Sequence, residues 1–167
     1  GHWCKGPGMD FIRAIRSTVG DAPIIAEDLG MLTPAVHRLL KNSGYPGMKV
    51  LQFAFNASEE STYLTHNLPN HCVVYTGTHD NDTTRGWLDC ASPEDLEFAM
   101  EYLGLEDLKE GNWAFIRAAL SSVADLAIVP FQDYLDLGSE ARINTPSTVG
   151  GTNWRWRMAK DCTTKKL

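Results

Sequence analysis

The residues of this 167-residue chain that could do chemistry gather in two acidic clusters. The first cluster is Glu27 with Asp28, and the second is the run of residues 78–83, which contains Asp80. A pair of carboxylates can perform glycoside chemistry, because one delivers a proton to the leaving oxygen while the other stays ionised and stabilises a cationic sugar. The residue types therefore indicate acid–base chemistry on a glycosidic bond.

Both clusters also have a structural interpretation. The first could be a solvated turn that caps the following helix, and the second an Asx-rich turn whose side chains hydrogen-bond the backbone. Metal binding is a further alternative, since His79, Asp80 and Asp82 could hold a divalent cation, but such a site usually has additional His or Asp ligands. Because those ligands are missing, we expect no metal. The chain also has no GxSxG, P-loop or GxGxxG motif, and we expect no cofactor.

Each cluster directly follows an apolar segment that we predict to be a buried strand. Four such strands are predicted, at residues 23–26, 48–53, 72–76 and 126–129. Helices are expected at residues 8–19, between Thr33 and Gly44, and from about residues 92 and 112 onward. Strands that alternate with helices imply right-handed crossovers and a parallel sheet. Glu27 and Asp80 then emerge at the carboxyl ends of two different strands, where they can face each other across a cleft.

This pattern fits two architectures, a small doubly wound sheet and part of a (β/α)8 barrel. A complete barrel takes about 250 residues, so four strands in 167 residues would make half of one. The order of strands and helices leaves both architectures open.

Charge and cysteine content exclude several classes of protein. The formal net charge is −6 and the basic residues are scattered, which argues against a nucleic-acid-binding surface. No apolar run approaches the roughly 20 residues of a membrane span, and the first residues lack the apolar region of a signal peptide. The cysteines are widely spaced and form no CxxC motif, so we expect free thiols in a reducing compartment, at Cys4, Cys72, Cys90 and Cys162.

Several long motifs resemble the 4-α-glucanotransferases, which are called amylomaltase in bacteria and disproportionating enzyme in plants. They are PIIAEDLG at residues 23–30, GYPGMKVLQFAF at residues 44–55 and VYTGTHDNDT at residues 74–83. VPFQD at residues 129–133, GSEARIN at residues 138–144 and NWRWR at residues 153–157 also agree. The resemblance extends in order over nearly the whole chain.

The resemblance implies a retaining transferase that cuts an α-1,4 bond in a maltooligosaccharide and passes the glycosyl group to another sugar. By position, Glu27 corresponds to the general acid/base, and Asp80 to the third carboxylate, which stabilises the oxocarbenium-like transition state. The remaining implied positions bind substrate, and they are His79, Asn144, Asp28 and Phe53. The Trp154 and Trp156 pair is interpreted as core packing near the end of the chain.

The resemblance also implies a fold, the C-terminal half (strands 5 to 8) of a TIM (β/α)8 barrel of the α-amylase-like clan, formed by residues 1–167. The N-terminal half is expected upstream of Gly1, together with the nucleophilic Asp, which retaining chemistry needs about 5 Å from the acid/base. We therefore expect the chain to be inactive alone. Ser147 departs from the family, which usually has Gly there.

Two alternatives stay open. The chain could be a non-catalytic α-glucan-binding module, or part of an α-glucan hydrolase of the same clan. The expected partners are maltooligosaccharides and α-1,4-glucans, with no nucleic acid and no membrane. The expected location is the cytoplasm, or the plastid in a plant or alga.

Overall fold

The computed structural model describes residues 1–2, 4–160 and 162. The chain divides into two compact units, Gly1–Met48 and Lys49–Leu167. No helix among the described residues combines the length and the apolar character that crossing a membrane requires.

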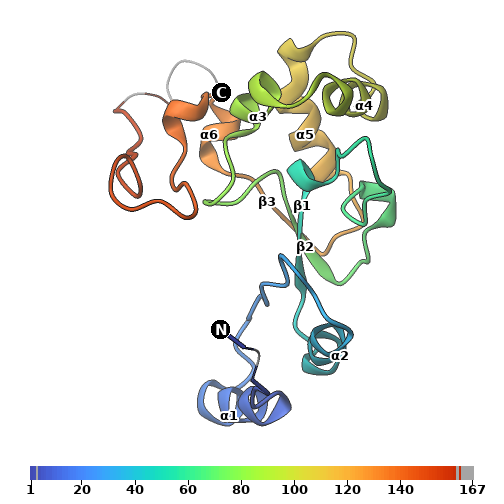
Figure 1. The fold of residues 1–167 in the computed structure, drawn as a ribbon, viewed down its shortest axis with the longest axis vertical. Helices are drawn as coiled ribbons and strands as arrows, with labels where there is room; N and C mark the ends of the chain where they lie inside the picture. The colour runs from blue at the N-terminus through green and yellow to red at the C-terminus, as the bar shows by residue number, and fades with distance from the viewer. Residues whose placement is uncertain (3, 161, 163–167) are drawn as a thin grey trace. The chain divides into compact units, whose positions relative to one another are not determined.

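The first unit is built on two helices that contact each other, α1 (Met9–Val19) and α2 (Pro34–Ser43) (Figure 1). Helix α2 begins where the Thr33 hydroxyl accepts a hydrogen bond from the backbone N–H of Val36, and it ends at Gly44 in the left-handed conformation. Arg16 of α1 donates a 2.6 Å hydrogen bond to the carbonyl of Ser43. Both predicted helices are confirmed.

The strand predicted at residues 23–26 is wrong, because these residues form neither helix nor strand. They make a single backbone hydrogen bond to the segment before the next strand, from the N–H of Ala26 to the carbonyl of Pro46. An apolar run becomes a strand only when a neighbour pairs with its backbone over several residues. The predicted strand at 48–53 is also shorter than expected, since β1 (Gly47–Val50) turns into a 3-10 helix at Leu51–Phe53.

The sheet has three strands in the order β1-β2-β3, with β2 at Cys72–Tyr75 and β3 at Leu126–Ile128. Strands β2 and β3 are parallel, with Val73 opposite Leu126 and Tyr75 opposite Ile128. The predicted parallel sheet is therefore confirmed for these two strands. Strand β1 crosses the boundary between the two units.

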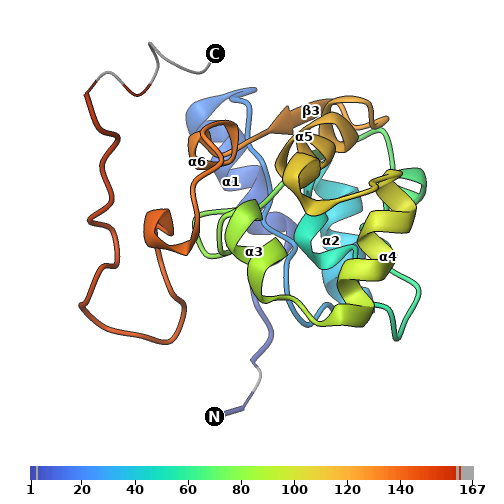
Figure 2. The same ribbon diagram turned by 90° about the horizontal axis from the view of Figure 1, so that it is seen from above.

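The described residues of the second unit form four α-helices, of which α5 contacts β3 and the other three contact α5. They are α3 (Thr84–Cys90), α4 (Pro93–Leu103), α5 (Gly111–Leu120) and the single turn α6 (Phe131–Tyr134). Helix α5 contacts α3, α4, α6 and β3, and Figures 1 and 2 show it beside α4 and β3. The core joins Phe115 of α5 to Val74 of β2 and to Phe55 and Leu88.

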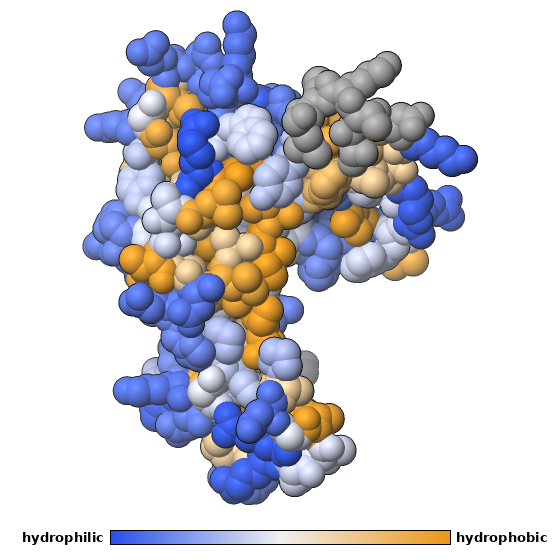
Figure 3. Space-filling model, turned by 180° about the vertical axis from the view of Figure 1, so that it is seen from behind, coloured by the Kyte–Doolittle hydropathy of each residue, from blue (hydrophilic) through white to orange (hydrophobic). Residues whose placement is uncertain are grey.

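The opposite face of the sheet is apolar but partly open. Because side chains alternate along a strand, Leu126 and Ile128 point away from the face on which Ala127 packs against the core. Leu126 is 48% exposed and Ile128 38% exposed. Figure 3 shows hydrophobic residues gathered on the surface of this unit.

Helices α3 and α6 were not expected from the sequence. Helix α3 is only seven residues long and contains Gly86, which disfavours helix. A Cβ at Gly86 would lie 2.4 Å from the Ser139 hydroxyl and 2.5 Å from the Asp82 carboxylate. Glycine is therefore required where this helix approaches the loops around the second cluster.

Candidate active site

The first cluster lies in the first unit, where its two carboxylates have different surroundings. Asp28 is 6% exposed, and its Oδ1 accepts a 2.6 Å hydrogen bond from the backbone N–H of Met48. A Cβ at Gly47 would lie only 2.8 Å from both Asp28 carboxylate oxygens. Glu27, by contrast, is exposed. Asp28 thus holds the start of β1, and Glu27 is the carboxylate of this cluster that is open to solvent.

The second cluster follows β2 as a turn that its own side chains stabilise. The Thr78 backbone N–H and hydroxyl both donate to Oδ1 of Asn81, at 2.9 and 2.8 Å. The N–H of Asp80 donates to the Thr78 hydroxyl at 3.3 Å. The interpretation of this run as an Asx-rich turn is therefore confirmed, and the turn leaves the Asp80 side chain half-exposed.

Three of the predicted site residues lie together around this turn. The side-chain amide of Asn144 donates a 2.6 Å hydrogen bond to Oδ1 of Asp80, and Nε2 of His79 lies 3.4 Å from the same oxygen. The backbone N–H of Asn144 donates to the carbonyl of His79 at 3.1 Å. Arg142 adds a 2.8 Å hydrogen bond to the backbone carbonyl of Asp80. This arrangement presents a carboxylate, an imidazole and an amide on one surface, which suits the hydroxyl groups of a sugar.

Asp82 has partners within the protein. Its Oδ2 accepts a 2.7 Å hydrogen bond from the Ser139 hydroxyl, and its Oδ1 accepts one from the backbone N–H of Thr83. Among the described residues, no group of three His, Cys, Asp or Glu side chains is arranged to hold a metal ion.

Phe53 lies in the second unit, after β1, and is exposed. Its ring contacts Tyr63 edge to face at 5.7 Å, and the Lys49 ammonium lies 5.1 Å from the centroid of the Tyr63 ring. Phe53 is thus an exposed ring that a neighbouring ring supports, and its substrate-binding role stays a prediction. Glu27 and Asp28 belong to the other unit, and their approach to Asp80 stays a prediction.

Asp133 is a buried carboxylate that supports the second cluster, and the sequence did not reveal this role. Asp133 is 2% exposed. Its Oδ2 accepts hydrogen bonds from the hydroxyls of Thr76 and Thr84 at 2.5 and 2.8 Å, and its Oδ1 accepts the Thr84 N–H at 2.8 Å. Burial raises the pKa of the Asp133 carboxyl above its ordinary value, and these hydrogen bonds lower the pKa in part. Asp133 thereby ties the end of β2 to the start of α3 and fixes both ends of the turn at residues 77–83.

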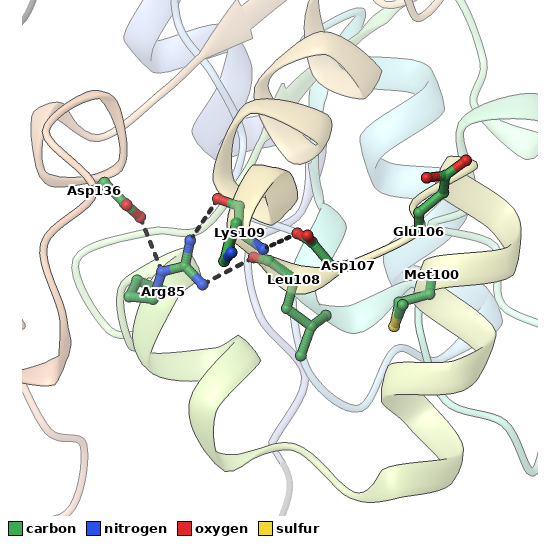
Figure 4. A pocket seen from close by; sticks show the side chains of 7 residues that line it. All are labelled: Arg85, Met100, Glu106, Asp107, Leu108, Lys109 and Asp136. Carbon is green, nitrogen blue, oxygen red and sulfur yellow. Dashed lines mark hydrogen bonds and ion pairs between the residues drawn. The ribbon is translucent and has the colours of Figure 1, made fainter.

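Two cavities are candidates for the site. A narrow one of about 30 Å³, about the space of one water, lies beneath the second cluster, lined in part by Thr78, His79, Asp82 and Arg142. A wider one of about 720 Å³ is lined by Arg85, Met100, Glu106, Asp107, Leu108, Lys109 and Asp136 (Figure 4).

None of the predicted site residues lines the wider cavity, and the arginine that lines it is hydrogen-bonded to other residues of the protein. Arg85 donates to the Asp136 carboxylate at 2.9 Å and to the carbonyls of Leu108 and Lys109 at 3.0 and 3.1 Å. We therefore place the candidate site at the open surface around Asp80 and not at this cavity.

Residues 1–163 match the family model described as 4-alpha-glucanotransferase. The chain is 48% identical over 168 residues to the 4-alpha-glucanotransferase of Clostridium butyricum, covering all of this chain and 34% of the relative. It is 50% identical over 158 residues to the chloroplastic/amyloplastic enzyme of Arabidopsis thaliana, covering 95% of this chain and 27% of the relative. The chain thus spans about a third of the length of the curated relatives it matches.

Two solved structures resemble the fold. The amylomaltase from Streptococcus agalactiae in complex with acarbose matches with a TM-score of 0.91 and 35% identity, over 99% of this chain and 33% of that one. The amylomaltase from Corynebacterium glutamicum matches with a TM-score of 0.61 over 84% of this chain and 25% of that one. At 21% identity, this second match concerns the fold alone.

Proposed function

Because this chain belongs to the 4-α-glucanotransferase family, we propose that it is part of an enzyme that transfers α-1,4-glucan segments between maltooligosaccharides. The observation that carries this proposal is the cluster of His79, Asp80 and Asn144, with the Asn144 amide 2.6 Å from Asp80 Oδ1. A carboxylate held in this way is preorganised to interact with the donor ring as positive charge develops on it.

In this proposal Glu27 is the general acid/base. It protonates the leaving oxygen during bond cleavage and then takes the proton from the incoming 4-hydroxyl of the acceptor sugar. Its exposure to solvent supports this role, since the proton donor must reach the glycosidic oxygen. Asp80 stabilises the oxocarbenium-like transition state, while His79, Asn144 and Phe53 bind the sugar.

We further propose that the sheet is part of a (β/α)8 barrel and corresponds to its strands 5 to 8, with residues 23–26 at the place of the fifth strand. In such a barrel helices cover the outer face and side chains fill the interior. The arrangement of β2 and β3 supports this, because α5 packs on one face and the other presents Leu126 and Ile128. The nucleophilic carboxylate is then supplied by sequence outside this chain, and the chain alone forms no glycosyl-enzyme.

The test is product analysis with maltotriose, using the intact enzyme that contains this sequence. The wild type is expected to release glucose and to build longer oligosaccharides, and Glu27→Gln to lower kcat by about 100- to 10,000-fold. Glu97→Gln, on the exposed surface of α4, is the matched control and should be unchanged. Glucose without longer products would show a hydrolase instead, and sugar binding without turnover a binding module. Turnover by the 167-residue chain alone would contradict the proposal that the nucleophilic carboxylate lies outside this chain.

A further inference from the structure

Trp154 has a position that hydrophobic burial does not explain. The sequence pattern suggested core packing, but the side chain is 57% exposed. Its backbone adopts φ of 63°, a left-handed conformation that bulky residues rarely adopt. Non-glycine residues in such conformations cluster at functional sites, where the surrounding structure holds them in place.

The surroundings of Trp154 hold both its backbone and its ring. Its N–H donates a 2.7 Å hydrogen bond to the carbonyl of Ile143, and its carbonyl accepts one from Arg157 at 3.1 Å. Its indole lies against the imidazole of His79, with ring centroids 5.2 Å apart and planes inclined by 38°. Trp154 therefore contacts the predicted site twice, through the residue before Asn144 and through His79.

The neighbouring Asn153 strengthens the same connection. Its Oδ1 accepts the backbone N–H of Thr145 at 2.9 Å, and its amide donates to the Thr148 hydroxyl at 2.8 Å. The segment at residues 153–154 thus binds the backbone on both sides of Asn144, whose amide holds Asp80.

We propose that Trp154 is a positioning residue that fixes the His79 imidazole beside Asp80. The indole covers one face of the imidazole, and Asp80 Oδ1 lies 3.4 Å from its Nε2. Trp154 acts through His79, so its role in glucan transfer rests on the proposed function, whereas the ring contact does not.

The first experiment tests the contact without any substrate. Contact with an imidazole quenches indole fluorescence, so His79→Gln should raise the emission of the chain. The same substitution should not raise the emission in a Trp154→Phe background. Trp156→Phe is the matched control, and in that background His79→Gln should still raise the emission. An equal rise in the Trp154→Phe background, or no rise in the wild type, would overturn the proposal.

The second experiment measures coupling in the intact enzyme with maltotriose. Trp154→Gly removes the ring but accepts the left-handed backbone, and should lower kcat/KM by about 10- to 100-fold. Trp154→Phe keeps an aromatic face and should largely restore it. The double variant Trp154→Gly/His79→Gln should be no slower than His79→Gln alone, because one residue acts through the other. Additive losses would overturn the proposal. A wild type without transfer would instead overturn the proposed function, and the fluorescence experiment would still decide the contact.

Discussion

The side-chain amide of Asn144 donates a 2.6 Å hydrogen bond to Oδ1 of Asp80, across 64 positions of sequence. The two residues come from separate loops, one directly after β2 and the other after the 3-10 helix Ser139–Ala141. Asp80 therefore depends on a distant loop for the orientation of its carboxylate.

Removing this hydrogen bond should impair catalysis more than folding. Asn144→Ala in the intact enzyme is expected to lower kcat/KM for maltotriose by about 10- to 100-fold, since a hydrogen bond to a charged group contributes about 1.5–3 kcal/mol. Val149→Ala, in the same loop and exposed, is the control and should change kcat/KM much less. Steady-state kinetics with maltotriose measures both, and equal losses would contradict a specific role for Asn144.

The buried Asp133 should make stability depend on pH. Its pKa is raised in the folded protein, so the folded state keeps this proton to a higher pH than the unfolded state, whose carboxyl has a pKa of about 3.9. The contribution of Asp133 to the free energy of unfolding therefore falls as pH rises from about 4 through the raised value. Urea unfolding of the wild type and Asp133→Asn over this range should show the wild type losing stability relative to the variant. A constant difference would contradict the raised pKa.

The same carboxylate has an expected structural role that a second substitution tests. Asp133→Leu leaves the hydroxyl of Thr76 and the hydroxyl and N–H of Thr84 without their acceptor, and should destabilise the chain by about 3 kcal/mol or more. Asp133→Asn keeps an oxygen for the Thr84 N–H and should be much milder. If Asp133→Leu unfolded at the same urea concentration as the wild type, this network would not hold β2 to α3.

Ser147 has a φ of 64°, a left-handed backbone conformation that residues other than glycine rarely adopt. Because glycine adopts this conformation without steric strain, Ser147→Gly should stabilise the chain by about 1 kcal/mol. Ser121, whose φ is −92°, offers a control, since Ser121→Gly should not stabilise. Thermal unfolding of the wild type and both variants gives the midpoints to compare. An unchanged or lower midpoint for Ser147→Gly would show that the Ser147 backbone is not strained.

Gly47 is the position in the first unit where a side chain should be least tolerated. A Cβ there would lie within 2.9 Å of three Asp28 carboxylate atoms, so Gly47→Ala should displace Asp28 from the Met48 N–H and destabilise the unit by about 1–3 kcal/mol. A Cβ at Gly6 meets nothing within 4 Å, and Gly6→Ala is the control. Hydrogen exchange at the Met48 amide reports the contact directly, and unchanged protection in Gly47→Ala would rule out the clash.

Local signals in the sequence were sufficient to predict several structural elements. Thr33 and Pro34 predicted the start of α2, and Gly44 its end, because capping and left-handed backbone depend on residues a few positions apart. The motif around Asp80 predicted a polar turn after β2, and the hydrogen bonds of Thr78 and Asn81 confirm it. The motifs along the chain were also sufficient to identify the family.

Interactions between residues far apart in the sequence decided the features that local signals did not predict. Residues 23–26 have the composition of a strand, but the described residues provide them with one backbone bond and no paired neighbour. The burial of Asp133 beneath Thr76, and the exposure of Trp154 against His79, likewise follow from segments that meet only when the chain folds. The sequence by itself therefore determined the family, most helices and the acidic residues, since these depend on local pattern. Only the tertiary structure decided which side chains hold Asp80, because those contacts join residues up to 64 positions apart.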